Sequence, residues 1–131
     1  MSSTTRITYT GVALPGNGAV VSLFDTTLAF PGASYLAQWG MKRIVVDLAH
    51  DQAGTLKAYK SDTRLTAPGA TPVWVQIENL AVAAPAANTS DVYDRLIEEF
   101  ADYKLEWTNG ATPQTLWKVD VALSSERVKS A

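Results

Sequence analysis

Short stretches in which apolar and polar residues alternate recur throughout this chain of 131 residues. In RIVVDLA (43–49), Ile44, Val46 and Leu48 occupy one face and the residues between them occupy the other. Successive side chains of a β-strand point to opposite faces of the sheet, so this period of two predicts a half-buried strand. Further strands are expected at 19–24, 34–40, 55–61, 72–78, 103–108 and 115–123. The alternation therefore favours β-structure over most of the chain.

Glycine, proline and asparagine separate these stretches. LPGNG and FPG interrupt residues 11–40 with Pro-Gly pairs, which disfavour a continuous helix. HDQAG (50–54) is expected to be a hairpin connection, and NGATPQ (109–114) a turn between its flanking strands. Strands roughly ten residues apart predict an all-β fold, an antiparallel β-sandwich or jelly roll of about seven to eight strands with at most one short helix. No linker divides the chain, so residues 1–131 are expected to form a single β-sandwich domain.

Segment 90–103 fits two structures. Its apolar residues recur four positions apart, as on one face of an amphipathic helix. Tyr93 and Ile97 also share one face of a strand, where aromatic and β-branched residues are common. We expect a strand over 91–97 followed by a short turn near 98–102, with a helix as the alternative.

The four tryptophans are expected in different places. Trp107 and Trp117 share faces with the other apolar residues of their strands, so both are expected in the core. Trp74 lies on the face opposite Val73 and Val75. It is therefore expected at an exposed contact or at an interface with a second chain.

The charge and composition exclude several classes of partner. The formal net charge is -2, with acids and bases spread along the chain, so no basic stripe is available for nucleic acid. No apolar run approaches the roughly 20 residues that cross a bilayer, and the first residues lack the profile of a secretion signal. The chain has no cysteine, which excludes a disulfide framework and a thiolate metal site. We expect no nucleic-acid partner, no membrane and residence in a cytoplasm.

His50 is the one candidate for acid–base chemistry, in the string DLAHD. On a continuing strand Asp47 and Asp51 share a face that His50 opposes, and no second histidine or cysteine completes a zinc shell. No G-x-S-x-G elbow supplies a nucleophile. We therefore expect a structural histidine, no catalytic residue, no metal, no cofactor and no enzyme. A small hydrolase that uses His50 and Asp51 is the alternative.

Two segments resemble small β-sandwich virion structural proteins of tailed bacteriophages: DQAGTLKAYKSD (51–62) and YKLEWTNGATPQTLWKVDVAL (103–123). In that family a D-Q-A-G-T-L strand start precedes an S-D turn, and a later T-N-G-A-x-x-Q-T hairpin closes the sheet. The residues that carry the resemblance are Asp51, Gln52, Gly54, Thr55, Leu56, Asn109, Gly110 and Gln114. The chain departs from the family where S-D-T-R replaces an S-D-G turn.

The resemblance implies a bacteriophage virion protein, most similar to a capsid decoration (cement) protein that binds the outer surface of the assembled shell and stabilises it. Its implied partners are the major capsid protein and itself, as a homodimer or homotrimer. Its implied location is the capsid surface, after synthesis in the host bacterial cytoplasm. A tail or baseplate accessory and a carbohydrate-binding host-adhesion module are alternatives.

Residues 1–16 are expected to form an extended N-terminal arm that contacts the capsid. Candidate protein–protein contacts are Leu14, Phe24, Phe30, Tyr35, Trp39 and Trp74. For each of them, ordinary core packing is the alternative.

Overall fold

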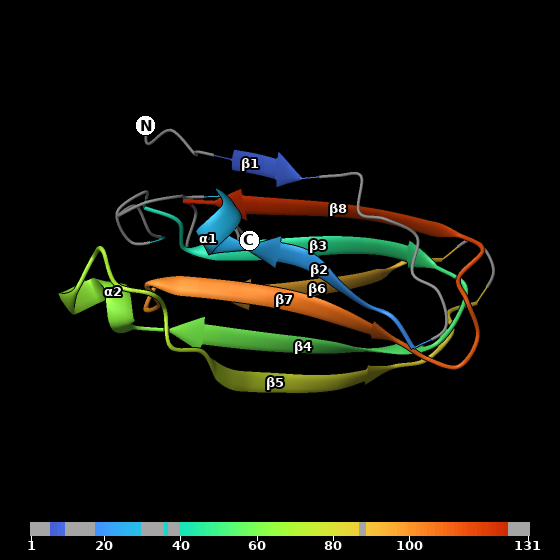
Figure 1. Cartoon of the computed structure of the whole chain (residues 1–131). Coiled ribbons are helices and arrows are strands. Elements are labelled where there is room, and N and C mark those ends of the chain that lie inside the picture. The colour runs from blue at the N-terminus through green and yellow to red at the C-terminus, as the bar shows by residue number, and fades with distance from the viewer. Residues whose placement is uncertain (1–5, 10–17, 30–35, 37–39, 87–88, 126–131) are drawn as a thin grey trace.

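Two four-stranded antiparallel sheets pack face to face (Figure 1). The computed structural model describes residues 6–9, 18–29, 36, 40–86 and 89–125. The first sheet has the order β1 (Arg6–Tyr9), β8 (Trp117–Ser124), β3 (Arg43–His50), β6 (Asp91–Leu96). The second has the order β2 (Val20–Asp25), β7 (Asp102–Asn109), β4 (Gly54–Ser61), β5 (Val75–Val82).

The strand order is that of a jelly roll. The first strand pairs with the last, β2 with β7, β3 with β6, and β4 with β5. Together these nested pairs form one long antiparallel ribbon. When the ribbon is rolled up, β3 also pairs with β8 and β4 also pairs with β7. Eight strands in two such sheets confirm the predicted all-β sandwich or jelly roll.

Two helices of four residues interrupt the strands, where at most one short helix is predicted. Helix α1 (Thr26–Ala29) follows β2, and α2 (Thr63–Thr66) follows β4. The Asp25 carboxylate accepts a hydrogen bond of 2.8 Å from the backbone N–H of Thr27, which satisfies a donor in the first turn of α1. No helix among the described residues has both the length and the apolar character needed to span a bilayer.

The core lies between the two sheets and follows the predicted alternation. Ile44, Val46 and Leu48 of β3 are buried, and so are alternate residues of β4, β7 and β8. Across the sandwich, the rings of Trp107 and Trp117 lie 5.5 Å apart between centroids. Trp107 is fully buried in the core between the sheets, and Trp117 is half-buried and packs against that core.

The predicted connections are wrong in two places. HDQAG does not close a hairpin, because β3 belongs to the first sheet and β4 to the second. For the same reason NGATPQ connects the two sheets rather than two neighbouring strands. Alternation determines which face of a strand is apolar, but every strand offers the same backbone hydrogen bonds, so the pattern does not identify its neighbour.

Of the remaining predictions, the one for segment 90–103 is confirmed and the bounds of the strand expected at 72–78 are wrong. Segment 90–103 is a strand, β6, followed by a turn, as expected. The strand expected at 72–78 runs instead over Val75–Val82. Four residues of the expected N-terminal arm, Arg6–Tyr9, form strand β1, which pairs with β8 at the sheet edge. The rest of that segment, and most of the strand expected at 34–40, lie outside the described residues.

Candidate interface at the open side of the sandwich

The residues that carry the family resemblance meet at one end of the sandwich. The Gln114 side-chain amide donates hydrogen bonds to the Gln52 carbonyl at 2.9 Å and to the Asn109 side-chain oxygen at 2.8 Å. Its oxygen accepts from the backbone N–H groups of Gln52 (2.9 Å) and Asp51 (3.1 Å). This buried amide therefore joins the loop after β3 to the loop after β7. We call the set Asp51, Gln52, Asn109 and Gln114 the loop clamp.

Asp51 completes the loop clamp from the surface. Its carboxylate accepts hydrogen bonds from the backbone N–H groups of Leu116 (2.9 Å) and Thr115 (2.8 Å), and also from the Thr115 hydroxyl. These donors favour the ionised form, the Leu116 N–H most of all, and hold the pKa of Asp51 well below its usual range. The carboxylate thus fixes the chain at the start of β8.

Two glycines of the same motif are required by close packing. A Cβ at Gly54 would lie 2.2 Å from the Trp107 ring, and a Cβ at Gly110 would lie 2.9 Å from the Ala53 carbonyl oxygen. The Trp107 ring also donates a 3.0 Å hydrogen bond to the Asn109 side chain. The motif that suggested a virion protein therefore forms a structural joint between the sheets.

His50 lies beside this joint and is buried. Its Nδ1 lies 2.8 Å from the Gln52 carbonyl oxygen and its Nε2 lies 2.6 Å from an Asp91 oxygen, while the ring packs edge-on against Trp107 at 5.1 Å. Neither hydrogen-bond partner is a hydroxyl that the imidazole could activate as a nucleophile. Among the described residues, no group of three or more His, Asp or Glu side chains is placed to hold a metal ion.

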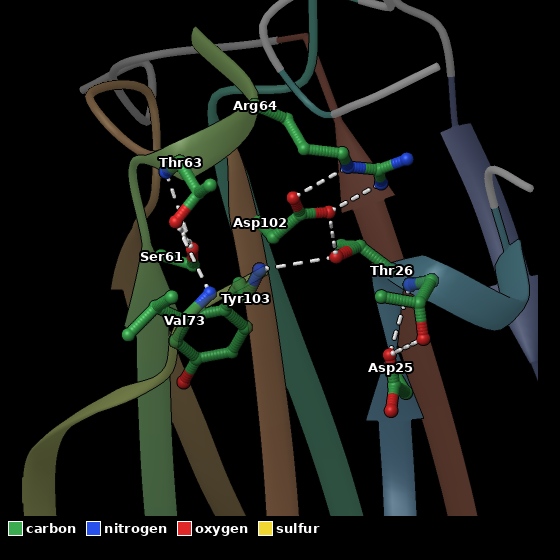
Figure 2. A network of polar contacts seen from close by, with 9 residues as sticks. Asp25, Thr26, Ser61, Thr63, Arg64, Val73, Asp102 and Tyr103 are labelled. Atoms are coloured by element: carbon green, nitrogen blue, oxygen red, sulfur yellow. Dashed lines mark hydrogen bonds and ion pairs between the residues drawn. The ribbon is translucent and has the colours of Figure 1, made fainter. Parts of the chain in front are cut away.

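A second polar network holds the opposite end (Figure 2). Arg64 of α2 donates to both oxygens of Asp102, at 2.8 Å and 2.6 Å, and the Thr26 hydroxyl donates to the same carboxylate at 2.6 Å. The Thr26 oxygen accepts in turn from the backbone N–H of Tyr103 at 3.2 Å. The bonds to Asp102 raise the pKa of Arg64, and both charged groups are buried. This network joins α1, α2 and β7.

The side of the sandwich formed by edge strands β5 and β6 is different. It exposes the aliphatic side chains of Val73, Val75, Leu80, Val92 and Leu96. Elsewhere in the described chain, the large exposed hydrophobic residues are Val20, Leu28, Leu65 and Leu116, which come from four separate segments. We call the β5–β6 side, with its five exposed aliphatic residues, the open side.

Every charged side chain of the two edge strands is bonded to another side chain within the chain. Glu78 of β5 pairs with Arg95 of β6. The other two acids of β6 are also bonded: Asp94 accepts from Arg43 at 2.8 Å, and Asp91 contacts His50. The open side therefore combines exposed aliphatic groups with charged groups that are bonded within the chain.

Tyrosine hydroxyls extend the Glu78 pair into the core. Tyr93 donates to Glu78 at 2.7 Å, and its oxygen lies 2.6 Å from the Tyr103 hydroxyl, which donates because the Tyr93 proton is already used. Burial, more than any other cause, raises the pKa of both tyrosines above the ordinary value of 10.0. The chain Tyr103–Tyr93–Glu78–Arg95 thus connects β5 and β6 across the two sheets.

A cleft of about 450 Å³ opens between β5 and β6, next to Leu80 and Val92. Core residues form its floor and Asp91 lies at its rim. Its lining is Val46, Leu48, Leu56, Leu80, Ala81, Val82, Ala83, Ala84, Pro85, Asp91, Val92 and Tyr93. An apolar side chain from another molecule could enter here without displacing an ion pair.

The predicted contact residues have separate outcomes. Phe24 is 4% exposed and belongs to the core, so the core alternative holds for it. Trp74 is half-buried on the outer face of the second sheet, where the Lys104 ammonium lies 4.8 Å from its ring centroid and 4.9 Å from that of Tyr59. The other four candidates, Leu14, Phe30, Tyr35 and Trp39, lie outside the described residues.

Sequence reasoning missed the open side. Val73 and Val75 share the apolar face of the strand predicted over 72–78, but both are exposed: Val73 precedes β5, and Val75 begins this edge strand. One signal was available: residues 72–86 contain a single charged side chain, Glu78. Edge strands commonly carry lysine or proline as protection against pairing, so an uncharged edge is informative.

No family model matches the sequence, and no curated protein matches it. The PBSX exported protein XepA has a similar fold: 17% identity and a TM-score of 0.61 over 95% of this chain and 39% of that one. The Tobacco streak virus coat protein aligns with 13% identity and a TM-score of 0.44 over 98% of this chain and 89% of its own, too weak a likeness to support a conclusion. This chain spans well under half of XepA, and the likeness to XepA concerns the fold.

Proposed function

We propose that this chain is a structural protein of a phage particle, specifically a decoration protein that binds the outside of the assembled capsid. The observation that carries the proposal is the contrast between the two clamped ends, where polar groups bond one another, and the open side. A surface of exposed aliphatic residues without unpaired charge is suited to contact with protein. The fold likeness to phage-related XepA supports the phage setting.

The proposed mechanism is binding to the shell and involves no catalysed reaction. A protein that binds the assembled lattice but not free capsid subunits stabilises the lattice by mass action. Many copies on one shell would turn weak individual contacts into strong total attachment. The interface would gain its free energy by covering aliphatic side chains such as Val92 and Leu96 of β6, which water contacts in the isolated chain.

Co-sedimentation tests this function. Purified protein is mixed with empty shells of the major capsid protein encoded in the same genome and, separately, with the free capsid subunits. We expect saturable pelleting with shells, a higher melting temperature of the shells, and no complex with free subunits. Absence of binding to shells, or fractionation of the native protein with tails, would contradict a decoration role.

A carbohydrate-binding role depends on the aromatic pair Trp74 and Tyr59. Sugar binding usually needs an exposed aromatic face, whereas Lys104 lies over both of these rings. A glycan array with wild type and Trp74→Ala separates the two functions. Glycan binding that the substitution abolishes would favour adhesion over decoration.

A further inference from the structure

We propose that the open side is a self-association surface, at which β5 of one copy pairs antiparallel with β5 of a second copy across a two-fold axis. This inference rests on the proposed function, because it names the first neighbour that such a structural protein would contact. Its test uses the isolated protein, so that it can fail or succeed separately from capsid attachment.

The backbone of β5 provides the first argument. Within the described part of the chain β5 pairs with β4 alone, and Figure 1 shows β5 at the lower border of the second sheet. Its outer edge therefore has no neighbouring strand among the described residues, although the Gln76 side chain donates to the Glu78 carbonyl at 3.3 Å. Such an edge is a template for another strand unless lysine, proline or a covering segment blocks it. The sequence VQIENLAV over Val75–Val82 contains neither lysine nor proline. The strand therefore lacks two of the usual obstacles to pairing, while a bulge interrupts its own register with β4 between Ala58 and Tyr59.

The charge distribution indicates a second copy of this chain. A two-fold axis places the same strand on both sides of the interface, so any unpaired charge would lie near an identical charge. Glu78 is the single charged residue of β5, and its side chain is 18% exposed and bonded to Tyr93 and Arg95. Neutralised in this way, it does not oppose the approach of an identical strand.

The apolar residues fit the same arrangement. In an antiparallel pair, the beginning of one β5, with Val73 and Val75, lies beside the end of the other, with Leu80. Each copy thus brings aliphatic side chains to both ends of the interface, and both ends are exposed in the single chain. The cleft between β5 and β6 lies beside Leu80 and has room for part of a neighbouring side chain. Pairing with a second copy would give the outer side of β5 a neighbouring strand and would cover the exposed aliphatic residues. The bonded Glu78 would not oppose this pairing.

Sedimentation velocity at micromolar concentrations, supported by light scattering, tests the proposal. Two variants place a charge at the edge, Val75→Lys and Leu80→Lys, at residues that are 51% and 41% exposed. The matched controls are Leu116→Lys and Leu65→Lys, at aliphatic residues 51% and 43% exposed but outside the open side. All four are compared with wild type by far-UV circular dichroism and thermal melting.

We expect twice the mass of one chain for wild type and both controls, and the mass of one chain for the two edge variants with an unchanged fold. The proposal is overturned by a monomeric wild type, by a trimer, by edge variants that remain dimeric, or by controls that also dissociate. If an edge variant fails to fold, hydrogen exchange of wild type decides: β5 amides that gain protection with concentration support pairing, and unaffected amides refute it. A protein that is dimeric but does not bind shells would contradict the decoration role and leave self-association supported. A protein that is monomeric but pellets with shells would contradict self-association and leave the decoration role supported.

Discussion

Strands β7 and β5 belong to the same sheet and both carry apolar side chains, but β7 buries its apolar residues whereas β5 leaves several exposed. In β7, Tyr103, Leu105 and Trp107 are fully buried, because β2 and β4 flank the strand and the first sheet covers its inner face. In β5, Val75 and Leu80 remain exposed, because β5 has a neighbour on one side only among the described strands. Burial of an aliphatic residue thus depends on the position of its strand as much as on its own alternation.

The same contrast holds for polar groups. At the clamped ends, buried carboxylates and amides form hydrogen bonds within the chain and hold loops together. At the open side, the ion pairs remove charge from the surface and leave aliphatic groups exposed. Substitutions at the two kinds of region should therefore differ in whether they affect folding or association.

Asp102→Ala should have the largest effect on folding, a loss of about 3–5 kcal/mol, because it leaves the buried Arg64 guanidinium without its partner. Chemical denaturation measures the change. The control is Asp62→Ala, which removes a surface carboxylate paired with Lys60 and should cost less than about 1 kcal/mol. Equal losses of stability in the two variants would show that the polar network of Figure 2 stabilises the fold no more than a surface ion pair does.

Gly54→Ala should cost about 1–3 kcal/mol, because the added methyl group would overlap the Trp107 ring. Gly69→Ala is the matched control, since a Cβ there meets no atom within 4 Å. It should change the stability by less than about 0.5 kcal/mol. A harmless Gly54→Ala would mean that the joint between the sheets is loosely packed.

Tyr93→Phe should cost about 1–2 kcal/mol, because the buried Tyr103 hydroxyl loses its acceptor. Both tyrosines have a raised pKa, so above pH 10 the unfolded chain releases protons that the folded chain retains, and the stability of wild type should fall as pH rises. The variant should lose less stability over the same alkaline range. Melting curves at several pH values measure both effects, and identical pH profiles would contradict the buried position of Tyr93.

Asp51→Asn should have a smaller effect, seen as a lower melting temperature near neutral pH. The folded chain holds the pKa of Asp51 below its ordinary value of 3.8, so the unfolded chain binds the proton first as pH falls. The stability that Asp51 contributes is present above about pH 4 and is lost as the pH falls towards the lowered pKa. The difference between wild type and variant should therefore shrink in acid. A constant difference would show that the charge of Asp51 is not what holds the Thr115 and Leu116 amides.

Val75→Lys should have the smallest effect on folding, within about 0.5 kcal/mol, although it is expected to abolish self-association. A large loss of stability would place Val75 in the folding core rather than at an interface.

The sequence predicted the core strands well because their pattern is local. Residues 103–108 alternate strictly and residues 43–49 nearly so, and every apolar residue on the predicted inner face is buried. The strand at β6 was also predicted, in spite of a competing helical spacing. The motif residues Asp51, Asn109 and Gln114 were identified by resemblance, but their convergence in one hydrogen-bonded clamp was not, because Asp51 follows β3 whereas Asn109 ends β7 and Gln114 follows it, more than 50 residues along the chain.

The alternation of apolar residues by itself determined that this chain forms strands and which face of each central strand is buried. The tertiary structure alone decided which strands are neighbours, that HDQAG and NGATPQ cross between sheets, and that β5 and β6 lie at the edge. The physical reason is that side-chain alternation acts between adjacent residues, whereas strand pairing uses backbone groups that are the same in every strand. Only the assembled jelly roll shows which of those groups remain unpaired within the described chain.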